Sequence, residues 1–397
     1  MKIINKASHL PILLQLIDRG FAFSFPLVVF WLFGGPQSFI TVELIFAWSG
    51  ILVVIFDLGA SSSVIRNGRP DSGVDRKTLA EISVKILFLG GGAALLIGTF
   101  AHWYINPDIR FWHIFSRTFY LAFLGVYLRF LVLENNHAKG FTSSITTWLL
   151  IFSASVFLGA FTDEIALNVL VITIPSVLVG LYIFRELIGA TGGLPLVLQS
   201  NVGWSLLWAR PIVLSSLLMM ANLNATRIIL IESFDEDLIE PILFWMRICM
   251  IIQVAHSVLY FVLSKDIVIG KFDASFKNKS FLFYGLGVFG AVGVVGLLFL
   301  LHLRFGIAPD VDWIVLAVIL MSTLAWCALG FNEAFFQKMD KTPLILIVHL
   351  SWITMLMFLL VWLGYEDPVE LIYLLCASGI FAMFFSFFLL TLNLRKA

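Results

Sequence analysis

Five arginines inside long apolar stretches are the residues of this sequence best suited to chemistry. They are Arg19, Arg117, Arg210, Arg227 and Arg247. An arginine at the centre of a bilayer costs about 2.5–3.5 kcal/mol on insertion scales, so it is expected to pair with another group or to face water. The guanidinium group is permanently charged and offers a planar set of N–H donors that binds phosphate in bidentate fashion. These residues therefore predict a site for an anionic, phosphate-containing ligand.

Helical spacing places other polar side chains beside these arginines. At 100° per residue, Gln15 projects within about 40° of Arg19, and Asn224 within about 40° of Arg210, with Arg227 on the flank of that face. The candidate substrate-binding residues are Arg19, Arg210, Arg227, Arg247, Arg117, Asn224 and Gln15. The alternative is structural ion pairing inside the protein, for example between Asp18 and Arg117 or between Glu43 and Arg247.

Two carboxylates in the same apolar stretches are candidates for ion coupling. Glu43 and Asp18 lie in different stretches. A carboxylate that is taken out of water can exchange a proton within the working pH range, because burial disfavours its charged form. We predict no metal site, no cofactor and no enzymatic activity, since the sequence lacks a metal-ligand cluster, a Walker motif and a nucleophile elbow.

The overall composition explains why these charges are unusual. The chain has 397 residues, of which 60% are hydrophobic and only 13% are charged. A soluble protein carries about 25% charged residues, so a water-soluble fold is excluded. The 25 basic and 25 acidic side chains cancel, and the balance gives no reason to expect a nucleic-acid partner.

Apolar runs of about 20 residues, each long enough to span a membrane, follow one another along the whole sequence. We predict twelve spans, at residues 10–33, 39–60, 80–101, 111–133, 143–161, 166–184, 202–231, 238–263, 281–303, 313–334, 343–364 and 369–392. The first run contains Asp18 and Arg19 and is too long for the core of a signal peptide, so we expect it to remain as the first span.

Basic residues in the connecting segments predict the orientation. The two tails and the loops after even-numbered spans carry 16 lysines and arginines, whereas the opposite loops carry only Arg110 and Arg304. Positively charged loops stay on the cytoplasmic side. We therefore expect a multi-pass membrane protein, with membrane lipid around it and both termini in the cytoplasm.

Matched features divide the chain into two halves, at residues 1–190 and 191–397. The third and ninth spans are both rich in glycine, and the first and seventh each carry an arginine, Arg19 and Arg210. Such repeats are common in transporters, which place their substrate between the repeated parts. The predicted fold class is an all-α integral membrane protein, with twelve transmembrane helices in two pseudo-symmetric six-helix bundles around a central cavity.

Short motifs in the first, second, seventh and eighth spans resemble those of a known family. They are the Gly-Pro turn at 33–39, Asp57-Leu58-Gly59 followed by Arg66, the Asn-rich segment 222–229 and the segment 245–248. This pattern is similar to that of the polysaccharide flippases of the multidrug/oligosaccharidyl-lipid/polysaccharide exporter superfamily. The sequence has Thr226 where that family commonly has an aspartate.

The resemblance implies a function. Such proteins move an oligosaccharide linked to undecaprenyl diphosphate across the inner membrane by alternating access, and work beside polysaccharide polymerases and chain-length proteins. A multidrug or other small-molecule exporter of the same superfamily is the nearest alternative, although it would more naturally present acidic residues. A membrane-embedded polysaccharide polymerase or ligase is a weaker alternative, because the outer loops are too short for a substantial active site.

Overall fold

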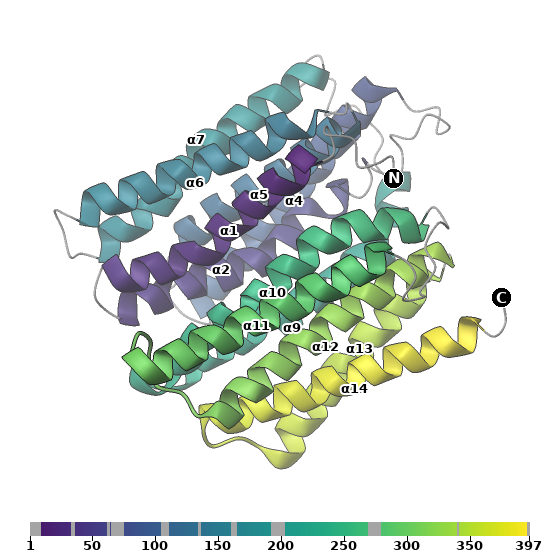
Figure 1. Cartoon of the computed structure of the whole chain (residues 1–397). Coiled ribbons are helices and arrows are strands. Elements are labelled where there is room, and N and C mark those ends of the chain that lie inside the picture. The colour runs from purple at the N-terminus through teal and green to yellow at the C-terminus, as the bar shows by residue number, and fades with distance from the viewer. Residues whose placement is uncertain are drawn as a thin grey trace. The chain divides into compact units, whose positions relative to one another are not determined.

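The computed structural model consists of long helices joined by short connections (Figure 1). It describes residues 9–32, 36–61, 64, 75–104, 111–133, 136–159, 165–191, 203–268, 279–339 and 341–394. Twelve helices lie in these ranges, and each corresponds to one predicted span. Apolar runs of this length form helices because a helix satisfies every interior backbone N–H and C=O group within one segment, as lipid requires.

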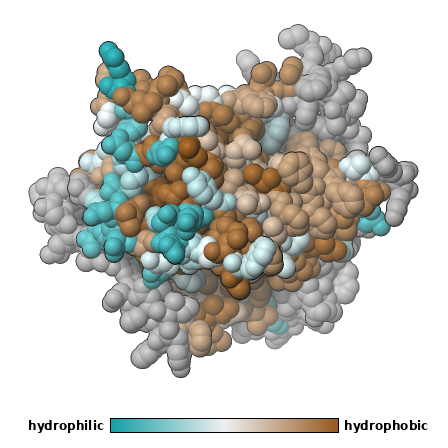
Figure 2. Space-filling view, turned by 90° about the horizontal axis from the view of Figure 1, so that it is seen from below, coloured by the Kyte–Doolittle hydropathy of each residue, from teal (hydrophilic) through white to brown (hydrophobic). Residues whose placement is uncertain are grey.

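The helices are α1 (His9–Leu32), α2 (Pro36–Asp57), α4 (Arg76–Tyr104), α5 (Phe111–Leu133), α6 (His137–Gly159), α7 (Ile165–Thr191), α9 (Gly203–Ser233), α10 (Glu236–Val268), α11 (Lys279–Phe305), α12 (Trp313–Lys338), α13 (Thr342–Leu363) and α14 (Pro368–Leu394). All twelve are long and apolar enough to cross a membrane. Many of their large apolar side chains are exposed, among them Leu96, Phe289 and Val361. Figure 2 shows hydrophobic side chains spread over one face, with hydrophilic ones gathered mainly toward one side. The predicted all-helical membrane fold is confirmed.

Two compact units make up the chain, Met1–Ala225 and Thr226–Ala397. The boundary falls within α9. Extensively packed helix pairs recur in corresponding places: α2 with α4, α2 with α5 and α5 with α7 in the first unit match α10 with α11, α10 with α12 and α12 with α14 in the second. This correspondence is the packing expected of a duplicated six-helix bundle. The division of the sequence at 190/191 stays a prediction.

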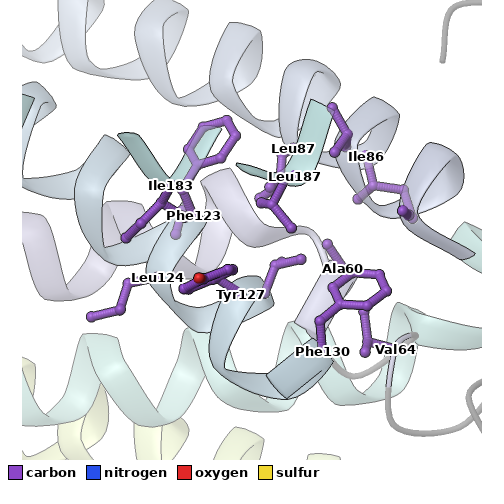
Figure 3. Close-up of a cluster of buried hydrophobic side chains, with 14 of the residues drawn as sticks. Ala60, Val64, Ile86, Leu87, Phe123, Leu124, Tyr127, Phe130, Ile183 and Leu187 are labelled. Carbon is purple, nitrogen blue, oxygen red and sulfur yellow. The ribbon is translucent and has the colours of Figure 1, made fainter. Parts of the chain in front are cut away.

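The largest apolar core of the first unit joins α2, α4, α5 and α7 (Figure 3). Leu87 of α4, Phe123 of α5 and Ile183 of α7 are almost completely buried in it. Ala60 and Val64, which follow α2, are buried in the same cluster. The second unit has its own cluster, which includes Phe336, Trp352 and Ala382.

A close approach of two backbones positions α4 against α2. A Cβ atom added at Gly90 would lie 2.0 Å from the carbonyl oxygen of Phe56, and one at Gly91 would lie 2.8 Å from the Phe56 ring. Only glycine leaves enough room for such contact, as is common where helices pack in lipid. The glycines at 90 and 91 therefore set the distance between the two helices.

A tight turn ends α2 at the Asp57-Leu58-Gly59 motif. Leu58 and Gly59 adopt positive φ angles of 41° and 82°. The Asp57 carboxylate accepts hydrogen bonds from the backbone N–H of Ser61 at 3.1 Å and from its hydroxyl at 2.9 Å. Asp57 also interacts electrostatically with Arg129 of α5. The aspartate of this motif thus holds the end of the helix in shape.

Candidate functional site

A buried polar cluster surrounds Asp18 in the first unit. Asp18 of α1 accepts a short hydrogen bond from the hydroxyl of Ser144 and another from the indole N–H of Trp148, both on α6. The hydroxyl groups of Ser144 and Tyr120 lie 3.2 Å apart. Because Ser144 and Trp148 are four residues apart, they lie on one face of α6 and meet the same carboxylate. Asp18 therefore ties α1 to α6.

Arg117 of α5 belongs to the same cluster. Its side chain is 5% exposed, and its guanidinium carbon lies 3.7 Å from the centre of the Phe46 ring and 5.2 Å from that of Trp148. The guanidinium group interacts electrostatically with Asp18. Stacking on aromatic faces and an acidic neighbour are the two means by which a protein accommodates a buried guanidinium. This arrangement favours the structural role that the sequence left open for Asp18 and Arg117.

The other candidates on α1 differ in exposure. Gln15 is buried, whereas Arg19, one turn further on, is exposed. Arg19 interacts electrostatically with the adjacent Asp18 and with Arg129 of α5. The positively charged guanidinium groups of Arg19 and Arg129 repel each other, and an anion bound between them would relieve that repulsion. Arg19 is thus an exposed arginine with a second basic group, Arg129, in its surroundings.

Glu43 and Asn224 lie on helices that meet in the first unit. Glu43 on α2 is 1% exposed, and Gly50 lies two turns further along that helix. A Cβ atom at Gly50 would lie 2.9 Å from Nδ2 of Asn224 on α9, so the Asn224 amide rests against the α2 backbone. Nδ2 of Asn224 also donates to the carbonyl oxygen of Met220 at 2.9 Å. Burial of Glu43 is the condition on which its predicted ion-coupling role depends.

Two deep arginines converge on α10 in the second unit. Arg227 of α9 is 7% exposed and donates from Nη2 to the sulfur of Met250 at 2.7 Å. Arg247, which is 2% exposed, lies three residues before Met250, on the same turn of α10. Both guanidinium-bearing residues are therefore held at one level of this helix. The Met250 contact could not be foreseen from the sequence, because a thioether is a weak and uncommon acceptor.

Arg210 is the remaining candidate. It belongs to α9, but its side chain lies outside the described residues. A hydrogen-bonded pair in the second unit, Glu333 and His349, was not among the predicted site residues. The only sequence signal for that pair is the presence of two titratable residues inside apolar spans. Within the described ranges, no group of three or more His, Cys, Asp or Glu residues could hold a metal ion.

The described part of the chain is built from two units of helices long and apolar enough to span a membrane, with corresponding pairs of packed helices. No protein-family model matches the chain, and no curated protein matches it. Solved structures do match. A multidrug resistance MATE family transporter of the MOP superfamily, in an outward-facing conformation, is 14% identical with a TM-score of 0.57, covering 100% of this chain and 99% of that one.

Two further structures extend the likeness. A mutant MATE transporter of Vibrio cholerae is 14% identical with a TM-score of 0.59, covering 98% of this chain and 97% of that one. A MOP superfamily transporter from Pyrococcus furiosus, described as having a binding pocket of reverse polarity that suggests a different function, is 12% identical with a TM-score of 0.53 and covers 98% and 96%. The chain has the fold of these transporters over its whole length.

Proposed function

We propose that this protein is a flippase that moves an oligosaccharide linked to undecaprenyl diphosphate from the cytoplasmic to the outer leaflet of a bacterial inner membrane, by alternating access. The observation that carries the proposal is the burial of Arg227 and Arg247 within the spans of the second unit. A diphosphate cannot cross hydrocarbon without compensation for its charge. Guanidinium groups supply that compensation as charge-assisted hydrogen bonds.

The polarity of these charges separates the proposal from its nearest alternative. A multidrug exporter is the second candidate, because the structural neighbours include a multidrug resistance transporter. Cationic drugs would be attracted by carboxylates and repelled by guanidinium groups. The neighbour from Pyrococcus furiosus is a case within this fold in which the polarity of the pocket has been linked to a different function. On that reasoning an arginine-rich interior favours an anionic substrate.

The proposal gives different roles to the candidate arginines. Arg19, Arg210, Arg227 and Arg247, with Asn224 and Gln15, would contact the diphosphate or the first sugars. Arg117 would contact substrate only after leaving Asp18 and its two aromatic neighbours. Asp18 is therefore proposed mainly as the counter-ion of Arg117, and Glu43 stays the stronger ion-coupling candidate of the two. The polymerase and chain-length proteins remain expected partners.

Complementation of a flippase-null strain tests the proposal directly. Arg19→Ala and Arg210→Ala are each expected to abolish surface polysaccharide while the protein inserts at normal levels. Lysine at the same positions should rescue only in part, because an ammonium group cannot form the bidentate contact. Arg304→Ala is the matched control, since Arg304 is an exposed arginine at the last turn of α11. Drug resistance without restored polysaccharide would favour the exporter and overturn the proposal.

Arg117 needs a separate test, because losing it would leave Asp18 buried beside apolar rings. Arg117→Met alone is expected to lower the amount of folded protein. Combining it with Asp18→Asn removes both charges, and should restore folding if the pair is structural. Restored polysaccharide in the double variant would show that Arg117 does not contact the substrate, whereas folded but inactive protein would return Arg117 to the substrate site.

A further inference from the structure

A hydrogen-bonded acid–base pair lies inside the second unit, apart from the arginines. Oε1 of Glu333 on α12 is 2.8 Å from Nε2 of His349 on α13. The His349 side chain is 1% exposed and that of Glu333 is 22% exposed. The imidazole is therefore enclosed by protein, while the carboxylate is the side of the pair that can be reached from outside the packed interior.

The hydrogen-bond geometry identifies the atom that can accept a proton. An ionised carboxylate only accepts hydrogen bonds, so Nε2 of His349 carries the hydrogen that it donates to Glu333. In the neutral imidazole the other nitrogen, Nδ1, then holds a lone pair. Nδ1 of His349 is buried and has no hydrogen-bond partner among the described residues. One proton can bind there without breaking the bond to Glu333.

A proton at that nitrogen changes the net charge of the pair. With a neutral imidazole, the pair carries one negative charge in surroundings of low dielectric constant, which is costly. A proton at Nδ1 converts it into a carboxylate–imidazolium pair with no net charge. The cost of burying the carboxylate is then offset by the attraction between the two partners.

On the helices packed against α12 and α13, the charged side chains among the described residues are Glu236, Asp237, Glu240 and Arg247 of α10 and Glu370 of α14. From α10, Tyr260 interacts electrostatically with Glu333, and His256 is hydrogen-bonded to Tyr284 of α11 at 2.6 Å. Both are neutral at physiological pH in their ordinary states. The other described titratable groups nearby in the sequence or on α14 are Lys341, exposed at the turn before α13, and Tyr373 and Cys376 in the first turns of α14.

We propose that the Glu333–His349 pair is a proton-binding site of the second unit, with Nδ1 of His349 as the accepting atom, and that this proton is the driving ion of transport. The driving role rests on the transport function proposed above, whereas proton binding does not. Glu333 accepts the hydrogen bond that fixes the tautomer, and its partly exposed edge is the side from which the pair can be reached.

A neighbouring tryptophan provides a direct readout. The His349 and Trp352 rings are stacked with centroids 6.2 Å apart and an interplanar angle of 25°. A charged imidazolium in such contact quenches indole fluorescence, so protonation should lower the emission of Trp352. Two other tryptophans, Trp245 and Trp326, also lie against histidines. Subtracting the pH titration of the Trp352→Phe variant isolates the contribution of this pair.

The experiment uses the full-length protein in lipid nanodiscs between pH 4 and 9. The wild-type minus Trp352→Phe difference should show a reversible quench with a slope of about one proton, because the pair titrates as a unit. His349→Gln should abolish this transition. Glu333→Gln should retain a transition but move its midpoint, because a neighbouring charge has been removed. Each variant is compared only if it elutes as a single species in size-exclusion chromatography, which shows that it is folded.

Two results would overturn proton binding: a flat wild-type difference curve, or a transition that persists unchanged in His349→Gln. A potentiometric titration gives an independent measure, since wild type should take up about one more proton per chain than His349→Gln over the same range. The same uptake in both proteins would also overturn it.

The driving role is tested in inverted membrane vesicles that contain the lipid-linked oligosaccharide. An imposed pH gradient should accelerate its transfer by wild type and leave transfer by His349→Gln unchanged. Equal wild-type transfer with and without the gradient would overturn the driving role. Absence of wild-type transfer under every condition would instead count against the flippase function, while the fluorescence titration would still decide whether the site binds a proton.

Discussion

The two glycine-rich helices, α4 and α11, are alike in sequence but have different surroundings. Gly90 and Gly91 of α4 lie directly against Phe56 of α2. On α11, a Cβ atom at Gly285, Gly290, Gly293 or Gly296 would meet nothing within 4 Å. The two units therefore share a pattern of glycines and of helix pairs, but only the first uses its glycines to bring two backbones together. Repetition in the sequence does not require repetition of each contact.

The first helices of the two predicted halves of the sequence, α1 and α9, differ in the same direction. In the first unit α1 packs extensively against α6 and α2. The corresponding helix, α9, shows no packing of that extent among the described residues, although Arg227 bonds to Met250 and Asn224 meets Gly50. Asp18 and Ser144 provide a polar connection between α1 and α6. Helix α1 is thus the more tightly tied of the two helices, and four substitutions test how the contacts of the two units differ.

Gly90→Ala is expected to have the largest effect. The added methyl carbon would lie 2.0 Å from the Phe56 carbonyl oxygen. The methyl carbon is attached directly to one helix backbone and the oxygen belongs to another, so neither can move aside alone. Overpacking of this kind costs about 3 kcal/mol or more when the backbone must shift. The measurement is the thermal unfolding of purified protein in detergent. Gly92→Ala on the same helix and Gly293→Ala on α11 have open space and should match wild type.

Ser144→Ala should destabilise the first unit by about 2 kcal/mol. The hydroxyl group that it removes is hydrogen-bonded to the charged group of Asp18 and lies near the hydroxyl group of Tyr120. Ser386→Ala is the matched change in the second unit, where the serine accepts from Asn332 at 3.1 Å. One neutral hydrogen bond in a membrane is worth about 0.6 kcal/mol on average. Denaturant titration of both variants would show equal losses if the two units were equally tied.

Gly330→Ala should cost about 1 kcal/mol, because its Cβ atom would lie 2.9 Å from Nε2 of the buried His256. His256 has little freedom to retreat, since its other ring nitrogen is bonded to Tyr284. Gly287→Ala is the control, because the atom it approaches is the flexible end of Leu259. A melting temperature that falls more for the control than for Gly330→Ala would contradict this explanation.

Asp75→Ala should have the smallest effect, confined to the start of α4. The Asp75 carboxylate accepts from the Thr78 backbone N–H at 2.9 Å, and its hydrogen bonds to Thr78 lower the pKa of this exposed group. Since the folded state has the lower pKa, its stabilising contribution is present at neutral pH and is lost as the pH falls through that value.

Amide exchange over residues 76–79 measures this effect. Protection factors should fall in Asp75→Ala at neutral pH, and in wild type below about pH 4, the ordinary range for an aspartate. Asp312→Ala removes the equivalent cap of α12, where the carboxylate accepts from Ile314 N–H at 2.8 Å. That variant should leave the start of α4 unchanged.

Hydropathy was enough to predict the twelve spans, since the length of an apolar run determines whether it can cross a bilayer. Matched glycines and arginines in the two halves indicated the duplicated architecture. The partners of the charged residues were harder to predict. The sequence allowed Asp18 to pair with Arg117, but it could not show that Ser144, Tyr120 and Trp148 complete the cluster, because these contacts depend on which helices become neighbours. It also gave no means of distinguishing the packed Gly90 from the open Gly293, since both occur in similar apolar surroundings.

Contact between the backbones of α2 and α4 limits how the first unit can deform. With Gly90 against the Phe56 carbonyl, there is no layer of side chains that could slide or change rotamer between the two helices. These helices must travel as one rigid body during any working cycle, and bending has to be absorbed elsewhere. In natural variants that keep this architecture, position 90 should tolerate no residue other than glycine.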